Sequence, residues 1–162
     1  MKRHQCGYSL VELLAVLAIL GVLVAMSMPM AEMAAERSRE QELKRALWEI
    51  RDALDAYHEA RLSGAIAAPA GVDQTAPAYP PDLQTLTLLQ PDLRPPHRGE
   101  SLRFLRRVPR DPFADAALPE EQTWGLRGYM SNADKPEPGP EVYDIHSLDQ
   151  GTALNGVPLA QW

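Results

Sequence analysis

The chain has 162 residues, including 15 prolines and 10 glycines, and a formal net charge of −6 at pH 7. An acidic chain with no lysine- and arginine-rich segment interleaved with aromatics is not expected to bind nucleic acid. Its single cysteine, Cys6, excludes an intramolecular disulfide, and no Cys/His spacing indicates zinc. We therefore expect one small, loop-rich domain after an apolar N-terminal segment.

The nineteen residues from Leu10 to Met28 have the length and apolar character of a membrane span, apart from Glu12. About 20 residues cross a bilayer, whereas the apolar part of a cleaved secretory signal has about 7 to 15. Lys2 and Arg3 come before the segment, which predicts a cytoplasmic N-terminus and an extracytoplasmic remainder. A carboxylate in hydrocarbon is costly, so Glu12 requires a partner.

Two simpler interpretations of this segment stay open. The chain could be a secreted protein cleaved after Ser27, or it could keep an uncleaved anchor, which would leave Glu12 unexplained. Ser9 and Glu12 also form the S-x-x-E pattern of a capping box. That pattern predicts a helix that begins near Ser9 without requiring a buried charge.

The sequence GYSLVE at residues 7–12, followed by apolar residues and Pro29, resembles the class III signal of type IV pilins and type II secretion pseudopilins. The resemblance implies that a prepilin peptidase cuts after Gly7 and N-methylates Tyr8, which replaces the family's usual phenylalanine. Glu12 then becomes the fifth residue of the mature chain, and it would neutralise the amine of a neighbouring subunit during filament assembly. Pro29 stands where the family commonly has proline.

Residues 30–62 are rich in Ala, Glu, Arg and Leu and lack internal proline and glycine, which predicts that the span continues as one long helix. Apolar residues recur there at steps of three and four, giving a stripe that covers a core: Leu43, Leu47, Ile50, Leu54 and Tyr57. Gly64 is expected to end the helix.

Residues 63–123 form a proline-rich loop region in which one short helix fits, Asp82 to Leu89. Asp82 is its candidate N-cap, and Leu83, Leu86 and Leu89 would share one side. Four arginines between Arg103 and Arg110 flank an apolar strip. They could form a basic patch for a partner, but a solvated face is the favoured interpretation.

Residues 124–162 are expected to form a small sheet and a C-terminal loop. Two runs have strand character, Trp124 to Met130 and Val142 to His146, and we expect an antiparallel pair with one face on the long helix. The turn-rich tail ends in Trp162, whose indole is expected to anchor it.

The order of the segments YPPDL, FLRRVPRDPF, WGLRGYMS and VYDIHS is similar to that of the major pseudopilins of type II secretion. The chain departs from the family in two places. Residues 114–123 form an insertion before Trp124. The family commonly binds calcium in its C-terminal loop, but calcium needs six to eight oxygens, and here only Asp149 and Asn155 are weak candidates. The alternative is a loop held by hydrogen bonds and Trp162.

These observations predict an α+β, type IV pilin-like fold, in which a long N-terminal helix packs on a small antiparallel sheet with long loops. The expected parts are a leader (1–7), an apolar transmembrane and assembly helix (8–29) and a periplasmic domain (30–162). No catalytic or nucleotide-binding signature occurs, so we predict a structural protein rather than an enzyme.

The function that the resemblance implies is that of a type II secretion pseudopilin in the bacterial inner membrane. Its partners would be the prepilin peptidase, copies of itself, other pseudopilins, and indirectly the inner-membrane platform with its ATPase. A type IV or minor pilin in adhesion, motility or DNA uptake is the nearest alternative, although the paired C-terminal cysteines common in type IV pilins are missing. A secreted or membrane-anchored binding domain is the alternative from another class.

Overall fold

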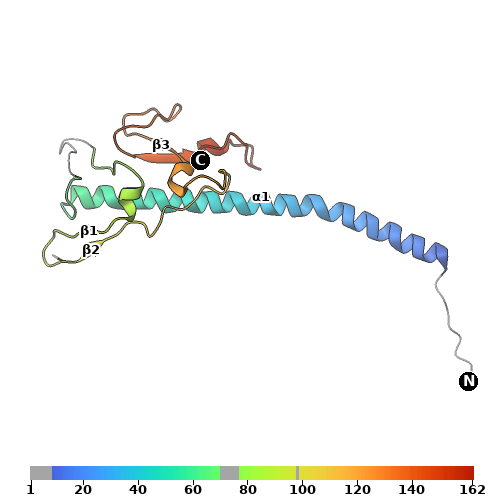
Figure 1. Ribbon diagram of the computed structural model, residues 1–162. Helices are drawn as coiled ribbons and strands as arrows, with labels where there is room; N and C mark the ends of the chain where they lie inside the picture. Colours follow the sequence, from blue (N-terminus) through green and yellow to red (C-terminus); the bar gives the residue numbers. More distant parts are fainter. Residues whose placement is uncertain (1–8, 70–76, 98) are drawn as a thin grey trace, which may run out of the picture. The chain divides into compact units, whose positions relative to one another are not determined.

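The computed structural model describes residues 9–69, 77–97 and 99–162 (Figure 1). These residues form a long N-terminal helix and small antiparallel sheets, and they confirm the α+β fold predicted from the sequence. The chain divides into two compact units, Met1–Ser38 and Arg39–Trp162. The core, the sheets and the loops all belong to the second unit.

Helix α1 extends from Leu10 to Leu62. It begins directly after Ser9, whose carbonyl accepts the N–H of Leu13 at 3.1 Å, so the predicted helix start is confirmed. The helix assignment is unbroken across position 29. Past its C-terminal end, Gly64 adopts a φ of 70°, a left-handed conformation that favours glycine and turns the chain back.

The second half of α1 supplies the apolar stripe around which the domain is built. All five predicted stripe residues are buried, Leu43, Leu47, Ile50, Leu54 and Tyr57. Side chains from every later part of the chain pack against them, among them Leu86, Leu105, Val142, Ile145 and Leu159. Complete burial of one such side chain stabilises the fold by roughly 1.5–3 kcal/mol, so the stripe is a major source of stability.

The short helix predicted at 82–89 is wrong in type and length. The structure has a 3₁₀ turn, η1, at Gln84–Thr87. Its N-cap position is Leu83 rather than the predicted Asp82, although Oδ1 of Asp82 accepts the N–H and the hydroxyl of Thr85, both at 2.8 Å. Leu83 and Leu86 are buried as predicted, but Leu89 is 60% exposed. The backbone turns extended at residue 88 and ends the helical turn.

Two very short strands inside the proline-rich region were not predicted. Strand β1, Gln90–Pro91, pairs antiparallel with β2, Ser101–Leu102. Two residues give no detectable alternation, and a proline within a run argues against a strand except at an edge. The N–H of Asp92 donates to the carbonyl of Glu100 across the loop at 2.9 Å, and an ion pair of 2.8 Å with Arg94 lowers the pKa of Asp92 to about 2.

The antiparallel pair predicted near the C-terminus is present, but its strands are shorter or shifted. Strand β3 is Trp124–Arg127 and β4 is Asp144–Ser147, with Leu126 opposite Ile145. In Figure 1, β3 is drawn on the other side of α1 from β1 and β2. Short 3₁₀ turns, η2 at Glu120–Thr123 and η3 at Leu159–Gln161, come before β3 and near the end of the chain.

Two glycines end the ladder of β3 and β4. A Cβ on Gly128 would lie 2.8 Å from the Cα of Gly139, so the backbones approach too closely for a side chain at this point. The N–H of Gly128 donates to the carbonyl of Glu137, and the N–H of Tyr129 donates to Oε1 of Glu141. The predicted strand therefore cannot continue to Met130, because the N–H groups of Gly128 and Tyr129 donate to Glu137 and Glu141 instead of to β4.

A buried carboxylate ties the RDPF segment to the strands. Asp111 is fully buried; its Oδ2 accepts the hydroxyl of Ser147 at 2.6 Å and its Oδ1 accepts the N–H of Phe113 at 2.8 Å. Its own N–H donates to Oγ1 of Thr123 at 3.2 Å. One side chain thus joins segments that lie 36 residues apart in sequence.

We expect Asp111→Ala to destabilise the domain, because the Ser147 hydroxyl and the Phe113 N–H lose their acceptor. A buried donor left without a partner costs about 1–3 kcal/mol. The free energy of unfolding can be measured by urea denaturation of the purified chain in detergent, followed by tryptophan fluorescence. Asp115→Ala is the control, since the side chain of Asp115 is exposed and accepts the N–H of Ala117 in its own turn. An equal loss in both variants would contradict the role assigned to Asp111.

Candidate functional site

The predicted processing site, Gly7 and Tyr8, lies outside the described residues. Glu12 lies in the first turn of α1 and is exposed. A carboxylate in the first turn is favoured by the partial positive charge of the helix N-terminus, so the local structure accommodates its charge. Pro29 lies within α1, and its side chain is not described. The roles of these four residues in processing and assembly stay predictions.

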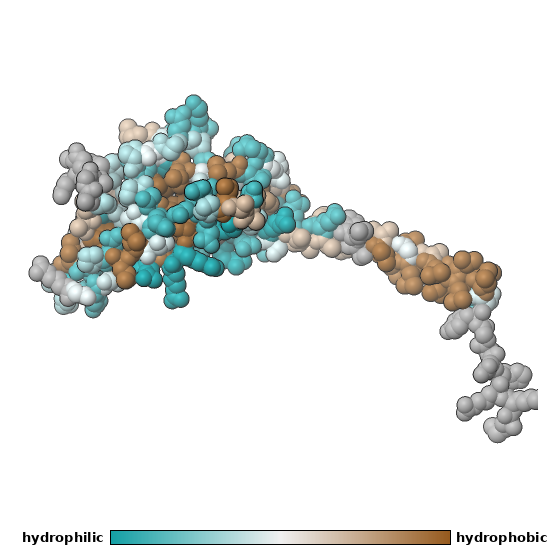
Figure 2. Space-filling model, in the orientation of Figure 1, coloured by the Kyte–Doolittle hydropathy of each residue, from teal (hydrophilic) through white to brown (hydrophobic). Residues whose placement is uncertain are grey.

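The helix around Glu12 exposes apolar side chains on every face. Residues 9–25 are all exposed, and α1 contains an 18-residue window with a mean hydropathy of 2.6. Figure 2 shows this part of the helix as a nearly continuous apolar surface. Length and composition suit a membrane span, and an apolar surface on all sides of a helix has to be covered by lipid or by other apolar helices.

The candidate calcium ligands are engaged by their own loop. Oδ1 of Asp149 accepts the N–H of Gly151 at 2.6 Å, and Oδ1 of Asn155 accepts the N–H of Val157 at 3.0 Å. The described residues contain no group of three or more His, Cys, Asp or Glu side chains that could hold a metal ion. A donor set with this few carboxylates does not fit calcium.

Three side chains of α1 hold the C-terminal loop instead. Arg51 donates to Oδ1 of Asp144 at 2.8 Å, to the carbonyl of Ile145 at 3.1 Å and to the carbonyl of Trp162 at 2.7 Å. This single guanidinium therefore joins the helix, β4 and the end of the chain. Sequence reasoning missed it, because nothing in the pattern of α1 distinguishes Arg51 from the exposed arginines.

Glu40 and Lys44 provide the other two contacts. Oε1 of Glu40 accepts the N–H of Leu154 at 2.6 Å, and Nζ of Lys44 lies 4.2 Å from the centre of the Trp162 ring. Trp162 also packs against the core, so the predicted anchoring of the terminus is confirmed. Hydrogen bonds and an indole do the work that a bound ion would do in a calcium-dependent loop.

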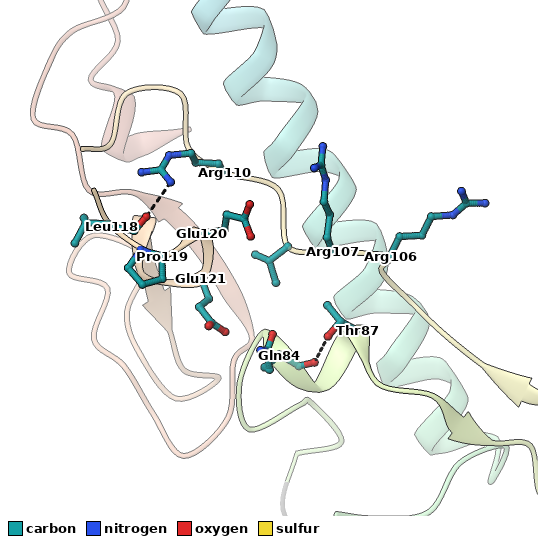
Figure 3. A pocket seen from close by; sticks show the side chains of 10 residues that line it. Gln84, Thr87, Arg106, Arg107, Arg110, Leu118, Pro119, Glu120 and Glu121 are labelled. Carbon is teal, nitrogen blue, oxygen red and sulfur yellow. Dashed lines mark hydrogen bonds between the residues drawn. The ribbon is translucent and has the colours of Figure 1, made fainter. Parts of the chain in front are cut away.

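The arginine-rich segment is mainly a solvated face, as favoured from the sequence. Arg103, Arg106 and Arg107 are exposed, whereas Leu105 and Val108 between them are buried. A hollow of about 430 Å³ lies beside this segment. Figure 3 shows that Arg106 and Arg107, among its lining residues, are directed away from its two glutamates.

Arg110 differs from the other three arginines, because it fixes the insertion. Its guanidinium donates to the carbonyl of Leu118 at 2.8 Å (Figure 3) and also to the carbonyl of Asp115. Residues 118–121 form one wall of the hollow. The segment expected from the sequence to be an insertion is therefore an ordered turn held by Arg110, which immediately precedes Asp111.

An aromatic cluster joins α1 to both ends of the loop between β3 and β4. Its members are His58 of α1, Tyr79, Tyr129 after β3 and Tyr143 before β4. The ring of Tyr79 stacks on His58 at 4.2 Å and meets the edge of Tyr143 at 5.1 Å. Burial raises the pKa of Tyr79, and the neighbouring Tyr143 and Asp55 raise it further. Such edge and stacked contacts stabilise packing, and the cluster gives no reactive pair of acid and base.

Comparison with known proteins identifies the N-terminal segment. Residues 2–28 match the prokaryotic N-terminal methylation motif. The match covers the predicted leader and the apolar start of α1, and it supports a type IV pilin-like protein, a structural subunit processed by a prepilin peptidase and assembled with other such subunits. Neither the curated proteins nor the solved structures gave a match to the chain.

We expect Arg51→Leu to loosen the C-terminal loop, because three acceptors lose one donor group. The free energy of unfolding should fall by roughly 1.5–3 kcal/mol, which is the range for one hydrogen bond to a charged group. We expect the loss of three such bonds to cost no more than this, because the site is only partly buried and water can replace part of what is lost. Arg45→Leu is the matched control, because Arg45 is exposed on the same helix. Urea denaturation and proteolysis of the C-terminal loop measure the difference, and two equally stable variants would refute the role of Arg51.

Calcium is expected to leave the stability of the purified chain unchanged. A ligand that binds only the folded state raises Tm in proportion to the logarithm of its concentration once the site is saturated. Thermal unfolding in calcium and in chelator, with magnesium as the control ion, tests this. A Tm that rises with calcium alone would show that the loop binds the ion despite its few carboxylates.

Proposed function

We propose that this protein is a pseudopilin: a subunit that is cut after Gly7, N-methylated at Tyr8 and assembled into the pseudopilus of a type II secretion system. The observation that carries the proposal is the methylation motif over residues 2–28, whose apolar part forms the start of α1 and is exposed on every face. A chain of this kind is held by the membrane until its apolar helix can pack among others.

Glu12 is the residue that gives this assembly selectivity. Cleavage would create a free amine at Tyr8, four residues before Glu12. An ion pair between Glu12 and the amine of a neighbouring subunit offsets the desolvation of both charges, whereas either charge alone in an apolar bundle is costly. A subunit is therefore accepted only where its carboxylate meets an amine.

The globular unit supports secretion rather than motility through its order of segments. The YPPDL segment leads into η1, and RDPF is fixed by Asp111 before the chain enters β3, in the order that resembles the major pseudopilins. The chain after Gly7 has no cysteine, so it lacks the disulfide-bonded loop common in type IV pilins. In this proposal the domain lies in the periplasm and the growing filament moves folded proteins toward an outer-membrane pore.

The N-terminal peptide of the protein from its native membrane provides the first test. An N-methylated Tyr8, seen by mass spectrometry, is the expected result. An N-terminus at Met28, or an intact Met1 in the assembled protein, would refute the proposal. Deletion of the gene then separates the two systems: loss of exported proteins indicates secretion, whereas loss of twitching or DNA uptake indicates a type IV pilus.

We expect Glu12→Val to abolish filament assembly while insertion and cleavage continue, because the amine of the neighbour loses its partner. Sheared filaments and the mass of the N-terminus report the two steps separately. Glu32→Val is the control, since Glu32 is exposed on α1 beyond the apolar segment. Filaments built only from the Glu12→Val protein would contradict this mechanism.

A further inference from the structure

An exposed tryptophan marks a groove beside the C-terminal loop. Trp48 is 69% exposed, an unusual position for the largest apolar side chain. It borders a hollow of about 220 Å³, whose lining residues are Lys44, Leu47, Trp48, Arg51, Asn155 and Trp162. We call this hollow the tryptophan groove. Two indoles and two cations give it an aromatic, positively charged character, and its tryptophans and its arginine are residue types enriched in protein interfaces.

The inserted turn has the opposite character. Residues 118–121, which we call the acidic turn, have the sequence Leu-Pro-Glu-Glu. Leu118, Pro119 and Glu120 are exposed. Arg110 holds the turn by the carbonyl of Leu118, as Figure 3 shows, so the start of the turn is fixed before any partner arrives. A preordered turn loses little conformational freedom on binding.

The groove and the turn lie at the same level of α1 but on different sides of it. Glu120 borders a second hollow together with Glu42, Arg45 and Glu49 of the helix. The groove uses Lys44, Trp48 and Arg51. At 3.6 residues per turn, or about 100° per residue, the two sets are centred roughly 125° apart around the helix. The acidic turn therefore cannot enter the tryptophan groove of its own chain, but it can enter the groove of a neighbouring copy.

We propose that the acidic turn of one copy docks in the tryptophan groove of the next copy, side by side. Leu118 and Pro119 would cover the indoles, while Glu120 and Glu121 would face Lys44. Among the described residues, neither these two glutamates nor Lys44 forms an ion pair within the chain. The contact joins unlike surfaces, so it repeats from copy to copy and suits a filament. This inference rests on the proposed function, because it needs copies held in parallel.

Cysteine cross-linking in cells tests the contact with the full-length chain. In a Cys6→Ser background, Asn155→Cys places a thiol in the groove and Glu120→Cys places one in the turn. The double variant is expected to give a ladder of dimers, trimers and larger species with a short bismaleimide. Each single variant is expected to give no ladder, because the contact pairs unlike residues. Asn155→Cys with Lys135→Cys is the matched control, since Lys135 is exposed elsewhere.

The outcomes separate this contact from the function on which it rests. A ladder in the double variant alone supports the contact. Filaments without a ladder overturn the contact and leave the pseudopilin proposal standing. If the unsubstituted protein has neither an N-methylated Tyr8 nor filaments, the contact and the pseudopilin proposal are both overturned.

Charge reversal gives a second, independent measurement. Lys44→Glu is expected to lower the yield of sheared filaments, because it places like charges across the contact. Glu121→Lys in the same chain is expected to restore the yield. The yield of Arg45→Glu, an exposed neighbour outside the groove, is the control. A yield that stays low in the double reversal would refute the pairing of Lys44 with the acidic turn.

Discussion

The structure depends on one helix that has to satisfy two different environments. The first part of α1 is apolar on every face, whereas the second part is apolar on a single stripe. A helix of the first kind is stable only among lipid tails or other apolar helices, and a helix of the second kind needs a domain to cover its stripe. The loops and sheets after Gly64 serve as that cover, and they are arranged around the five stripe residues.

A cover with so little regular structure has to be fixed by individual side chains. In the part of the chain that the structure describes, the longest strands have four residues, so backbone ladders satisfy few polar groups. Asp111 and Arg51 take over much of this task, because each binds groups from segments far apart in the sequence, while Asp82 fixes the turn at η1. Stability in such a domain depends on a few polar contacts that tie its loops to the helix and the strands.

The sequence was most informative where one physical effect dominates. The long helix, its buried stripe and the antiparallel pair all follow from apolar periodicity, which depends only on the residues along one element. The strand ends near Gly128 and the turn at η1 could not be predicted, because they depend on contacts with distant residues such as Gly139. The roles of Arg51 and Glu40 were hidden for the same reason: a charged residue on a helix gives no sign of which loop it will meet.

The close approach of Gly128 and Gly139 also limits how this protein can diverge. A Cβ on either glycine would lie within about 3 Å of the other's Cα, so neither can be replaced unless the backbone moves. The loop between them faces no such limit, because its residues 132–135 are exposed. Related chains are thus free to vary this loop in length and composition, while the two glycines stay as a pair. The loop is consequently the place where lineages can acquire new surface chemistry without disturbing the core.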